Sequence, residues 1–98
     1  MGMLTIDEIK KAVTKIGKKY GIKTAYLFGS YARGEANNNS DVDIIIDKGE
    51  IRGLQLSGFR LDLIDELGGV DVDVLTTGSV RPKFFDFIKD DRVLLYGT

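Results

Sequence analysis

Four aspartates form two closely spaced pairs, and this spacing is the clearest sign of chemistry in the sequence. One residue separates Asp41 from Asp43, and Asp71 and Asp73 repeat the arrangement further along the chain. Residues two apart in a β-strand point to the same face, with Cα atoms about 6.6 Å apart, so each pair can converge on a small cation. Carboxylate oxygens without imidazole or thiolate ligands favour Mg²⁺ or Mn²⁺ over zinc.

Composition narrows the remaining chemistry. The 98 residues include no His and no Cys, which excludes a Ser-His triad, a thiolate zinc site and a cysteine nucleophile. The length and the 43% apolar content predict a single packed domain over residues 1–98. A net charge of −1 argues against direct nucleic-acid binding. Without a secretory leader or an apolar run that could span a bilayer, we expect a cytoplasmic protein that does not bind membranes.

The aspartate pairs need a physical reason to cluster. Two carboxylates about 4 Å apart repel by on the order of 4 kcal/mol at an effective dielectric constant of 20. A divalent ion or a bound proton would relieve that repulsion. The alternative is that each aspartate alternates onto the wet face of a strand, which would explain one such pair more readily than two.

A glycine and a serine precede the first aspartate pair. Gly29-Ser30 follows an aromatic and apolar stretch, and backbone amides at such a turn can approach a phosphate. Alone the dipeptide is ordinary turn chemistry. Together with Asp41 and Asp43 it forms the pattern G-S-x10-D-x-D, which average residue usage would produce about once in 10⁵ starting positions.

The elements that must position these residues alternate along the chain. The apolar spacing, with Thr5 and Glu8 as a capping box, predicts a helix over 5–20. Further helices are expected from Ser30 as N-cap, over 54–67 and from Pro82, the last burying Phe84, Phe85 and Ile88. Strands are expected over 23–28, 41–47, 70–76 and 93–96, with loops over 34–40 and 48–53. This order predicts an α/β (α+β) domain with a small mixed β-sheet flanked by helices.

The segment LFGSYARGEANNNSDVDIII resembles the signature of the DNA polymerase beta-like nucleotidyltransferase superfamily. Nearly the whole chain is similar to the minimal nucleotidyltransferases, the antitoxin partners of HEPN toxins. The later segment LSGFRLDLIDELGGVDVDVLTTGSVRP is similar to that family's helix and third acidic strand. The resemblance implies the polymerase beta-like nucleotidyltransferase fold.

The resemblance also implies a role for each matching residue. Gly29 and Ser30 would hold a nucleoside triphosphate, ATP, and Arg33 would meet its phosphates, although Arg33 could equally be a surface residue paired with Glu35 or a nearby Asp. Asp41 and Asp43 would bind two Mg²⁺ ions, or Mn²⁺. The third carboxylate would be Asp73, with Asp71 as the alternative. Tyr31, beside the phosphate turn, could touch nucleotide or acceptor.

The resemblance suggests the acceptor as well. It implies transfer of AMP to a tyrosine of a HEPN toxin, which would silence the toxin. Because the chain has no room for a second domain, the acceptor must come from another polypeptide, or a homodimer must complete the pocket. Three alternatives stay open: transfer to a small molecule such as an aminoglycoside, an antitoxin that masks its partner without catalysis, and a purely structural domain.

Overall fold

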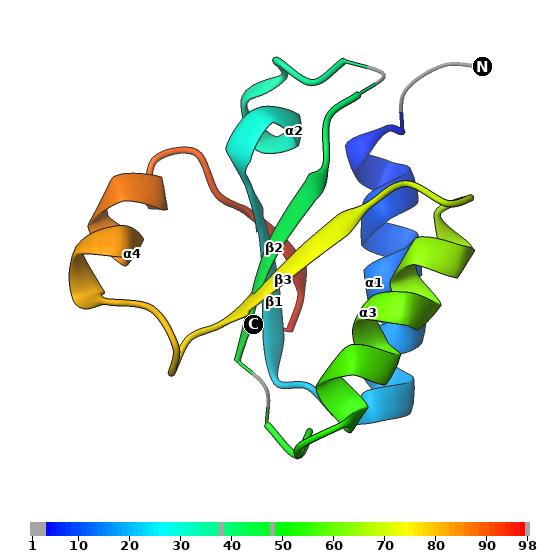
Figure 1. Ribbon diagram of the computed structural model, residues 1–98. Helices are drawn as coiled ribbons and strands as arrows, with labels where there is room; N and C mark the ends of the chain where they lie inside the picture. The colour runs from blue at the N-terminus through cyan, green and yellow to red at the C-terminus, as the bar shows by residue number, and fades with distance from the viewer. Residues whose placement is uncertain (1–3, 38, 48, 98) are drawn as a thin grey trace.

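The structure is a computed structural model that describes residues 4–37, 39–47 and 49–97. Four strands form one mixed sheet in the order β3-β2-β1-β4 (Figure 1). The strands are β1 (Thr24–Phe28), β2 (Val42–Asp47), β3 (Val72–Thr76) and β4 (Val93–Tyr96). The strand β2 runs parallel to β3 and antiparallel to β1, and β1 pairs antiparallel with β4. The predicted mixed sheet is therefore confirmed.

Helices cover the two faces of this sheet unequally. The helices are α1 (Ile6–Tyr20), α2 (Gly29–Arg33), α3 (Gln55–Glu66) and α4 (Pro82–Ile88). Figure 1 shows α1 and α3 side by side against one face, while the shorter α4 stands on the other and α2 sits above the end of β1. One face is thus closed by two long helices, and the other stays partly open near α2.

The helix α1 is defined by its N-terminal cap, its C-terminal glycine and its apolar face. The side chain of Thr5 accepts a hydrogen bond from the backbone N–H of Glu8, and the Glu8 carboxylate accepts one from the N–H of Thr5. Gly21 ends the helix in the left-handed conformation, at φ 73°. The apolar residues between these caps face the sheet, and Ile9 and Val13 are fully buried. The predicted capping box is confirmed, and the helix ends at Tyr20 as expected.

Alternation along β2 divides the core between the two faces. Val42, Ile44 and Ile46 belong to the main core, together with buried residues of α1 and α3. Side chains alternate along a strand, so Asp43 and Ile45 point to the other face, the one that carries α4. Ile45 is buried there but lies outside the main cluster. Asp43 therefore shares the more open face with α4.

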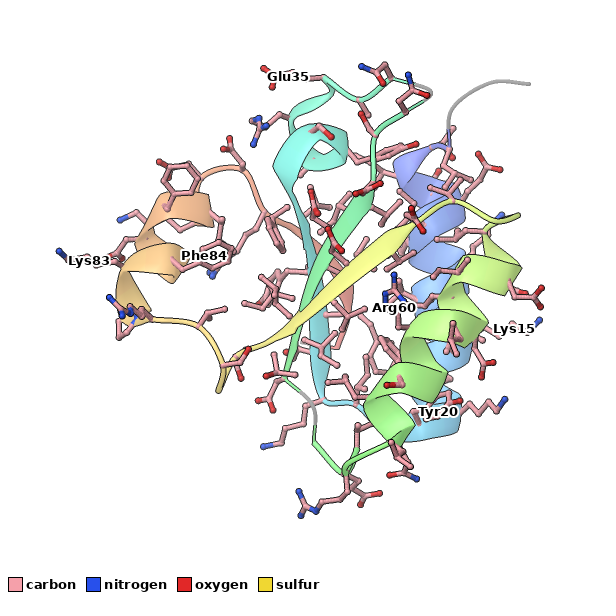
Figure 2. All side chains as sticks on the ribbon, in the orientation of Figure 1. Lys15, Tyr20, Glu35, Arg60, Lys83 and Phe84 are labelled. Carbon is pink, nitrogen blue, oxygen red and sulfur yellow. The ribbon has the colours of Figure 1, made fainter. Side chains whose placement is uncertain are left out.

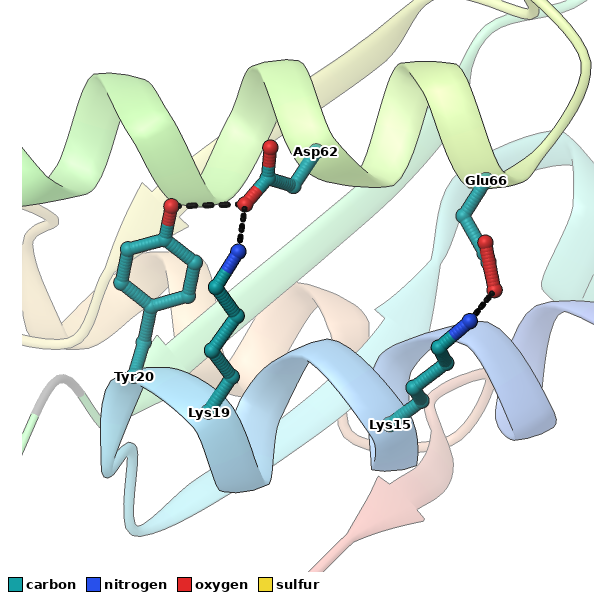
Figure 3. Close-up of polar contacts among 5 residues, drawn as sticks. All are labelled: Lys15, Lys19, Tyr20, Asp62 and Glu66. Carbon is teal, nitrogen blue, oxygen red and sulfur yellow. Dashed lines mark hydrogen bonds and ion pairs between the residues drawn. The ribbon is translucent and has the colours of Figure 1, made fainter.

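Polar side chains fasten α1 to α3 on the closed side. The Tyr20 hydroxyl donates to the Asp62 carboxylate at 2.7 Å, and Lys19 Nζ reaches the same carboxylate at 3.0 Å (Figure 3). Lys15 pairs with Glu66 at the other end of the contact, at 2.6 Å. The Tyr20 ring also packs edge-on against Phe59. Asp62 and Glu66 of α3 therefore both link this helix to α1.

Two local expectations are wrong. Ser30 is not the N-cap of α2, because the helix already begins at Gly29 with Phe28 as its N-cap residue and without a side-chain cap. Tyr31 does not face a nucleotide site: it is 7% exposed and belongs to the main core. Tyr31 is the buried residue of this short helix, and the half-buried Ala32 beside it also packs against the core.

The side chains of α4 match the expected buried set in part. Ile88 is buried as predicted and Phe84 is half-buried, while the side chain of Phe85 and the loop residues Asn38 and Lys48 lie outside the described residues. Phe87 on the same helix is 79% exposed. Among the helices described, none is both long and apolar enough to cross a membrane.

Candidate active site

The pairing of β2 with β3 brings two aspartates from distant parts of the chain together. In the parallel register Asp43 lies opposite Asp73, just as Val42 lies opposite Val72. Directly paired residues of neighbouring strands share a face, so both carboxylates project on the side of α4. On its other side Asp43 pairs with Phe28, the last residue of β1. Asp43 thus lies between the turn after β1 and Asp73 on β3. We call Asp41, Asp43 and Asp73 the carboxylate row.

The electrostatics of Asp43 reflect these neighbours. Partial burial, the largest cause, and the nearby charges of Asp73 and Asp41 together raise the pKa of its carboxyl to about 6. The Arg33 guanidinium opposes the shift only weakly. A carboxylate surrounded by carboxylates is at its most stable when a proton or cation joins it. The group therefore has the character of a cation ligand.

Gly29 lies directly against this carboxylate. A Cβ atom at position 29 would overlap Oδ2 of Asp43, and the glycine also adopts φ 76°, which residues with a side chain rarely tolerate. Both constraints require glycine here. The backbone at the start of α2 consequently approaches the carboxylate row closely, and Ser30 follows within the same turn.

Arg33 stands at the other end of α2, paired with an acid. Its Nε donates to Oε1 of Glu35 at 2.8 Å, and the contact is largely exposed, as Figure 2 shows for Glu35. The Glu35 hydrogen bond raises the pKa of Arg33, and the charges of Asp91 and Asp43 add to that shift. The structure thus contains the Glu35 pair that the surface interpretation expected, while Arg33 remains close enough to Asp43 to feel its charge.

The contribution of Asp91 was missed by the sequence analysis. Asp91 follows α4 in a turn, where its N–H donates to the carbonyl of Ile88. No local pattern links it to Arg33, because only the tertiary fold brings the end of α4 near α2. Phe84 anchors α4 to the sheet by packing edge-on against Phe28, at a ring-centroid distance of 5.3 Å (Figure 2). The helix α4 therefore forms one wall beside the carboxylate row.

The two candidates for the third carboxylate occupy different positions. Asp73 lies inside β3 and interacts with Asp43, whose pKa it raises. Asp71 precedes the strand, and its backbone carbonyl accepts a hydrogen bond from the N–H of Val42 at 2.9 Å. Asp41 likewise stands just before β2 and is exposed, yet its charge also reaches Asp43. The charges of Asp41 and Asp73 thus both act on Asp43, whereas Asp71 is not among the residues that shift its pKa.

A metal ion would fit this donor set as a shared ligand. In the described part of the chain, no group of three or more Asp, Glu, His or Cys side chains is arranged so that it could hold a metal ion. Mg²⁺ seldom needs such a group, because it binds through one or two carboxylates and keeps waters or substrate phosphates in its remaining positions. The all-oxygen donors and the mutual repulsion around Asp43 suit such an ion. Metal binding stays a prediction.

Comparison with known proteins places this geometry in context. A family model described as nucleotidyltransferase domain matches residues 6–95. A protein of Methanocaldococcus jannaschii called "Putative protein adenylyltransferase" is 42% identical over 91 residues, covering 92% of this chain and 97% of its own. The protein adenylyltransferase MntA of Thermococcus cleftensis is 35% identical over 85 residues, covering 83% and 86%.

The same fold occurs in a solved toxin–antitoxin complex. A chain in the structure of the tri-AMPylated Shewanella oneidensis HEPN toxin with MNT antitoxin matches with a TM-score of 0.72 at 20% identity. The match covers 96% of this chain and 74% of that one. At this identity the likeness concerns the fold alone.

Proposed function

Because the chain belongs to the nucleotidyltransferase domain family and is itself a nucleotidyltransferase, we propose that it moves AMP from ATP to a tyrosine hydroxyl of a HEPN toxin and so acts as an antitoxin. The observation that carries the proposal is the in-register pair Asp43 and Asp73 beside the Gly29 turn. The names of two relatives support a protein acceptor, and the AMPylated HEPN toxin in the solved complex supports its class.

Under this proposal the β1–α2 turn receives the triphosphate. Gly29 lets the chain approach closely because it has no side chain, and Ser30 offers a backbone N–H and a hydroxyl as donors. Arg33 uses its terminal nitrogens for a phosphate oxygen, since Glu35 occupies Nε only. These three residues bind and orient ATP without forming a bond to it.

The carboxylate row carries the charge and proton work. Asp41, Asp43 and Asp73 would hold Mg²⁺, in two ions, with Mn²⁺ as a possible substitute. When bound, the metal neutralises triphosphate charge and aligns the displacement. Asp43 stays ionised in that state, because a cation replaces the proton that its neighbours otherwise favour. Asp73, at the β3 end of the row, would accept the proton of the incoming hydroxyl.

The transfer itself is a substitution at the α-phosphorus of ATP. The acceptor oxygen forms a bond to that phosphorus while the bond from phosphorus to the bridging oxygen of the β-phosphate breaks. Pyrophosphate leaves with that electron pair, and the hydroxyl proton passes to the Asp73 carboxylate. Phosphoryl transfer needs little covalent help from a protein, so a chain without His can carry it out.

A labelling assay tests the proposal. The protein is incubated with Mg²⁺, the product of the adjacent gene as the candidate HEPN partner, and ATP labelled on either the α- or the γ-phosphate. We expect the partner to gain label from α-labelled ATP alone, together with the mass of one or more AMP groups. Phosphorylation would instead transfer the γ label and would contradict the proposal.

Matched variants connect the label to the site. The double variant Asp41→Asn/Asp43→Asn should lose the label, while Asp65→Asn, an exposed aspartate on α3, should keep it. If the wild-type protein binds and silences its partner without labelling it, the protein masks the toxin and the catalytic proposal is wrong. Homodimer formation stays a prediction that gel filtration of the isolated protein would check.

A further inference from the structure

A polar hollow of about 280 Å³ opens beside the carboxylate row. Its walls are Asn39, Ser40 and Asp41, which lead into β2, and the loop 68–71, which leads into β3. The hollow shares Asp41 with the proposed site. The carbonyl of Asp71 accepts a hydrogen bond from the N–H of Val42, which ties the loop to the start of β2. The hollow therefore lies where β2 and β3 begin.

The order of the strands indicates on which side of the reacting groups the hollow lies. Gly29 follows β1, Asp43 lies on β2 and Asp73 on β3, and these three strands are neighbours in that order. In a phosphoryl transfer the attacking and leaving oxygens lie roughly in line through the phosphorus. If the pyrophosphate end rests at the β1 turn, the acceptor must arrive from the β3 side. The hollow lies on that side.

The charges around the hollow indicate what kind of acceptor would fit. Asp41 and Asp71 are both exposed there, and the other five lining residues are neutral. Asp41 is assigned to the metal, which leaves Asp71 available to an incoming group. A carboxylate at this rim attracts Arg or Lys and repels acidic segments. The loop beside it presents Gly68 and Gly69, so a polypeptide can approach its backbone closely.

We propose that this hollow receives the acceptor segment of the partner protein, and that Asp71 selects a hydroxyl-bearing residue flanked by basic residues. The inference rests on the proposed function, since it assigns the acceptor side of the same reaction. Asp71 is a specificity-determining residue in this account and is not a metal ligand. Asp71 lies two residues before Asp73, the residue proposed to accept the hydroxyl proton.

Two short peptides serve as probes. Both contain one tyrosine, which is flanked by four arginines in one peptide and by four glutamates in the other, and both carry a fluorophore. Their affinities are measured by fluorescence anisotropy on the wild-type protein and on Asp71→Lys. The matched control is Glu50→Lys, which makes the same charge change at the opposite end of β2.

We expect the wild-type protein to bind the arginine peptide about tenfold more tightly than the glutamate peptide. Asp71→Lys should remove or reverse that preference, whereas Glu50→Lys should retain it. In the transfer assay Asp71→Lys should raise the KM for the HEPN partner about tenfold and leave the KM for ATP unchanged. A preference that survives in Asp71→Lys, or that is absent from the wild-type protein, would overturn the inference.

The two readouts separate this inference from the function on which it rests. Transfer to the HEPN protein that is unaffected by Asp71→Lys would leave the proposed function standing and refute the acceptor site. Failure of the wild-type protein to label its partner would refute the proposed function, while peptide binding would still decide whether the hollow selects basic segments. A change in the KM for ATP would assign Asp71 to the nucleotide side and would also refute the inference.

Discussion

Asp43 and Asp62 are the same side chain in opposite surroundings, one on each face of the sheet. The Tyr20 hydroxyl and the Lys19 ammonium lower the pKa of the Asp62 carboxyl by donating hydrogen bonds to it. Burial and two neighbouring aspartates raise the pKa of Asp43 to about 6. Asp62 is thus satisfied by the protein, whereas Asp43 is destabilised in its charged form until a cation arrives.

This difference separates structural from functional acids without reference to any relative. Asp62 and Glu66 face cations from α1, and those contacts link two helices that also share apolar core. Asp43 faces other acids, and folding alone would not select that arrangement. Conflict between like charges in an otherwise satisfied fold is typical of a functional site. The predictions below test this division, beginning with the largest effect.

The largest effect should come from the third carboxylate. We expect Asp73→Asn to reduce kcat for AMP transfer by about a hundredfold or more, because it removes the group that accepts the hydroxyl proton. Asp71→Asn should change kcat less than tenfold, since Asp71 lies at the rim of the site. Single-turnover transfer to the HEPN partner measures both. The opposite ranking would make Asp71 the third carboxylate.

A smaller effect is expected at the triphosphate end. Arg33→Ala should raise the KM for ATP about tenfold, the loss typical of one charge-assisted hydrogen bond, with a lesser change in kcat. Glu35→Gln keeps an oxygen that can accept from Nε, so it should remain near the wild-type KM. Initial rates over a range of ATP concentrations would check both variants. An unchanged KM for ATP in Arg33→Ala would mean that Arg33 is only a surface residue paired with Glu35.

Stability without metal should move in the direction opposite to activity. Asp43→Asn removes both the desolvation cost and the repulsion, so we expect the metal-free protein to gain about 1 kcal/mol after allowance for solvent screening, or about 5 °C in Tm. Asp41→Asn should raise Tm less, because Asp41 is exposed. Thermal unfolding in chelator measures both. A clear fall in Tm for either variant would contradict the repulsion argument.

The pH dependence of stability should show the same contrast, because Asp43 and Asp62 contribute to it with opposite signs. The folded pKa of Asp43 lies above the unfolded value of about 3.9, so its contribution to stability is full below pH 4 and is lost as the pH rises through about 6. Asp62 has a lowered folded pKa, so its contribution is present above the unfolded pKa and is lost as the pH falls through the folded value. Denaturant unfolding between pH 3 and 8 should show Asp43→Asn and Asp62→Asn changing the profile in opposite directions.

The smallest effect is expected where one structural hydrogen bond is removed. Tyr20→Phe keeps the ring against Phe59 but removes the hydroxyl that donates to Asp62, so Tm should fall by a few degrees. AMP transfer per folded molecule should stay at the wild-type level, because α1 and α3 lie on the face away from the carboxylate row. Loss of transfer in this variant would mean that the two faces are coupled.

Local patterns predicted much of the fold. The capping box of Thr5 and Glu8 and the end of the first helix at Tyr20 depend on neighbours within four residues, and the structure confirms both. The N-cap at Ser30 failed because Gly29, at positive φ, already begins the helix. The inward turn of Tyr31 depends on core space that only the packed helices define.

The residue types of the site could be predicted from the sequence, but the contacts between them could not. The spacing of Gly29, Ser30, Asp41 and Asp43 lies within one strand–helix–strand segment and could be found from the sequence. The choice between Asp71 and Asp73 depends on the register of β2 against β3, which is set by long-range pairing. The approach of Asp91 to Arg33 has the same origin.

The central claim is that carboxylates with carboxylate neighbours perform the reaction, whereas carboxylates paired with cations stabilise the fold. Its most direct test compares AMP transfer per folded molecule in Asp43→Asn and Asp62→Asn, with Tm recorded on the same metal-free samples. We predict that Asp43→Asn is more stable than the wild-type protein and inactive, and that Asp62→Asn is less stable and active. An active Asp43→Asn, or an inactive Asp62→Asn that remains folded, would contradict the account.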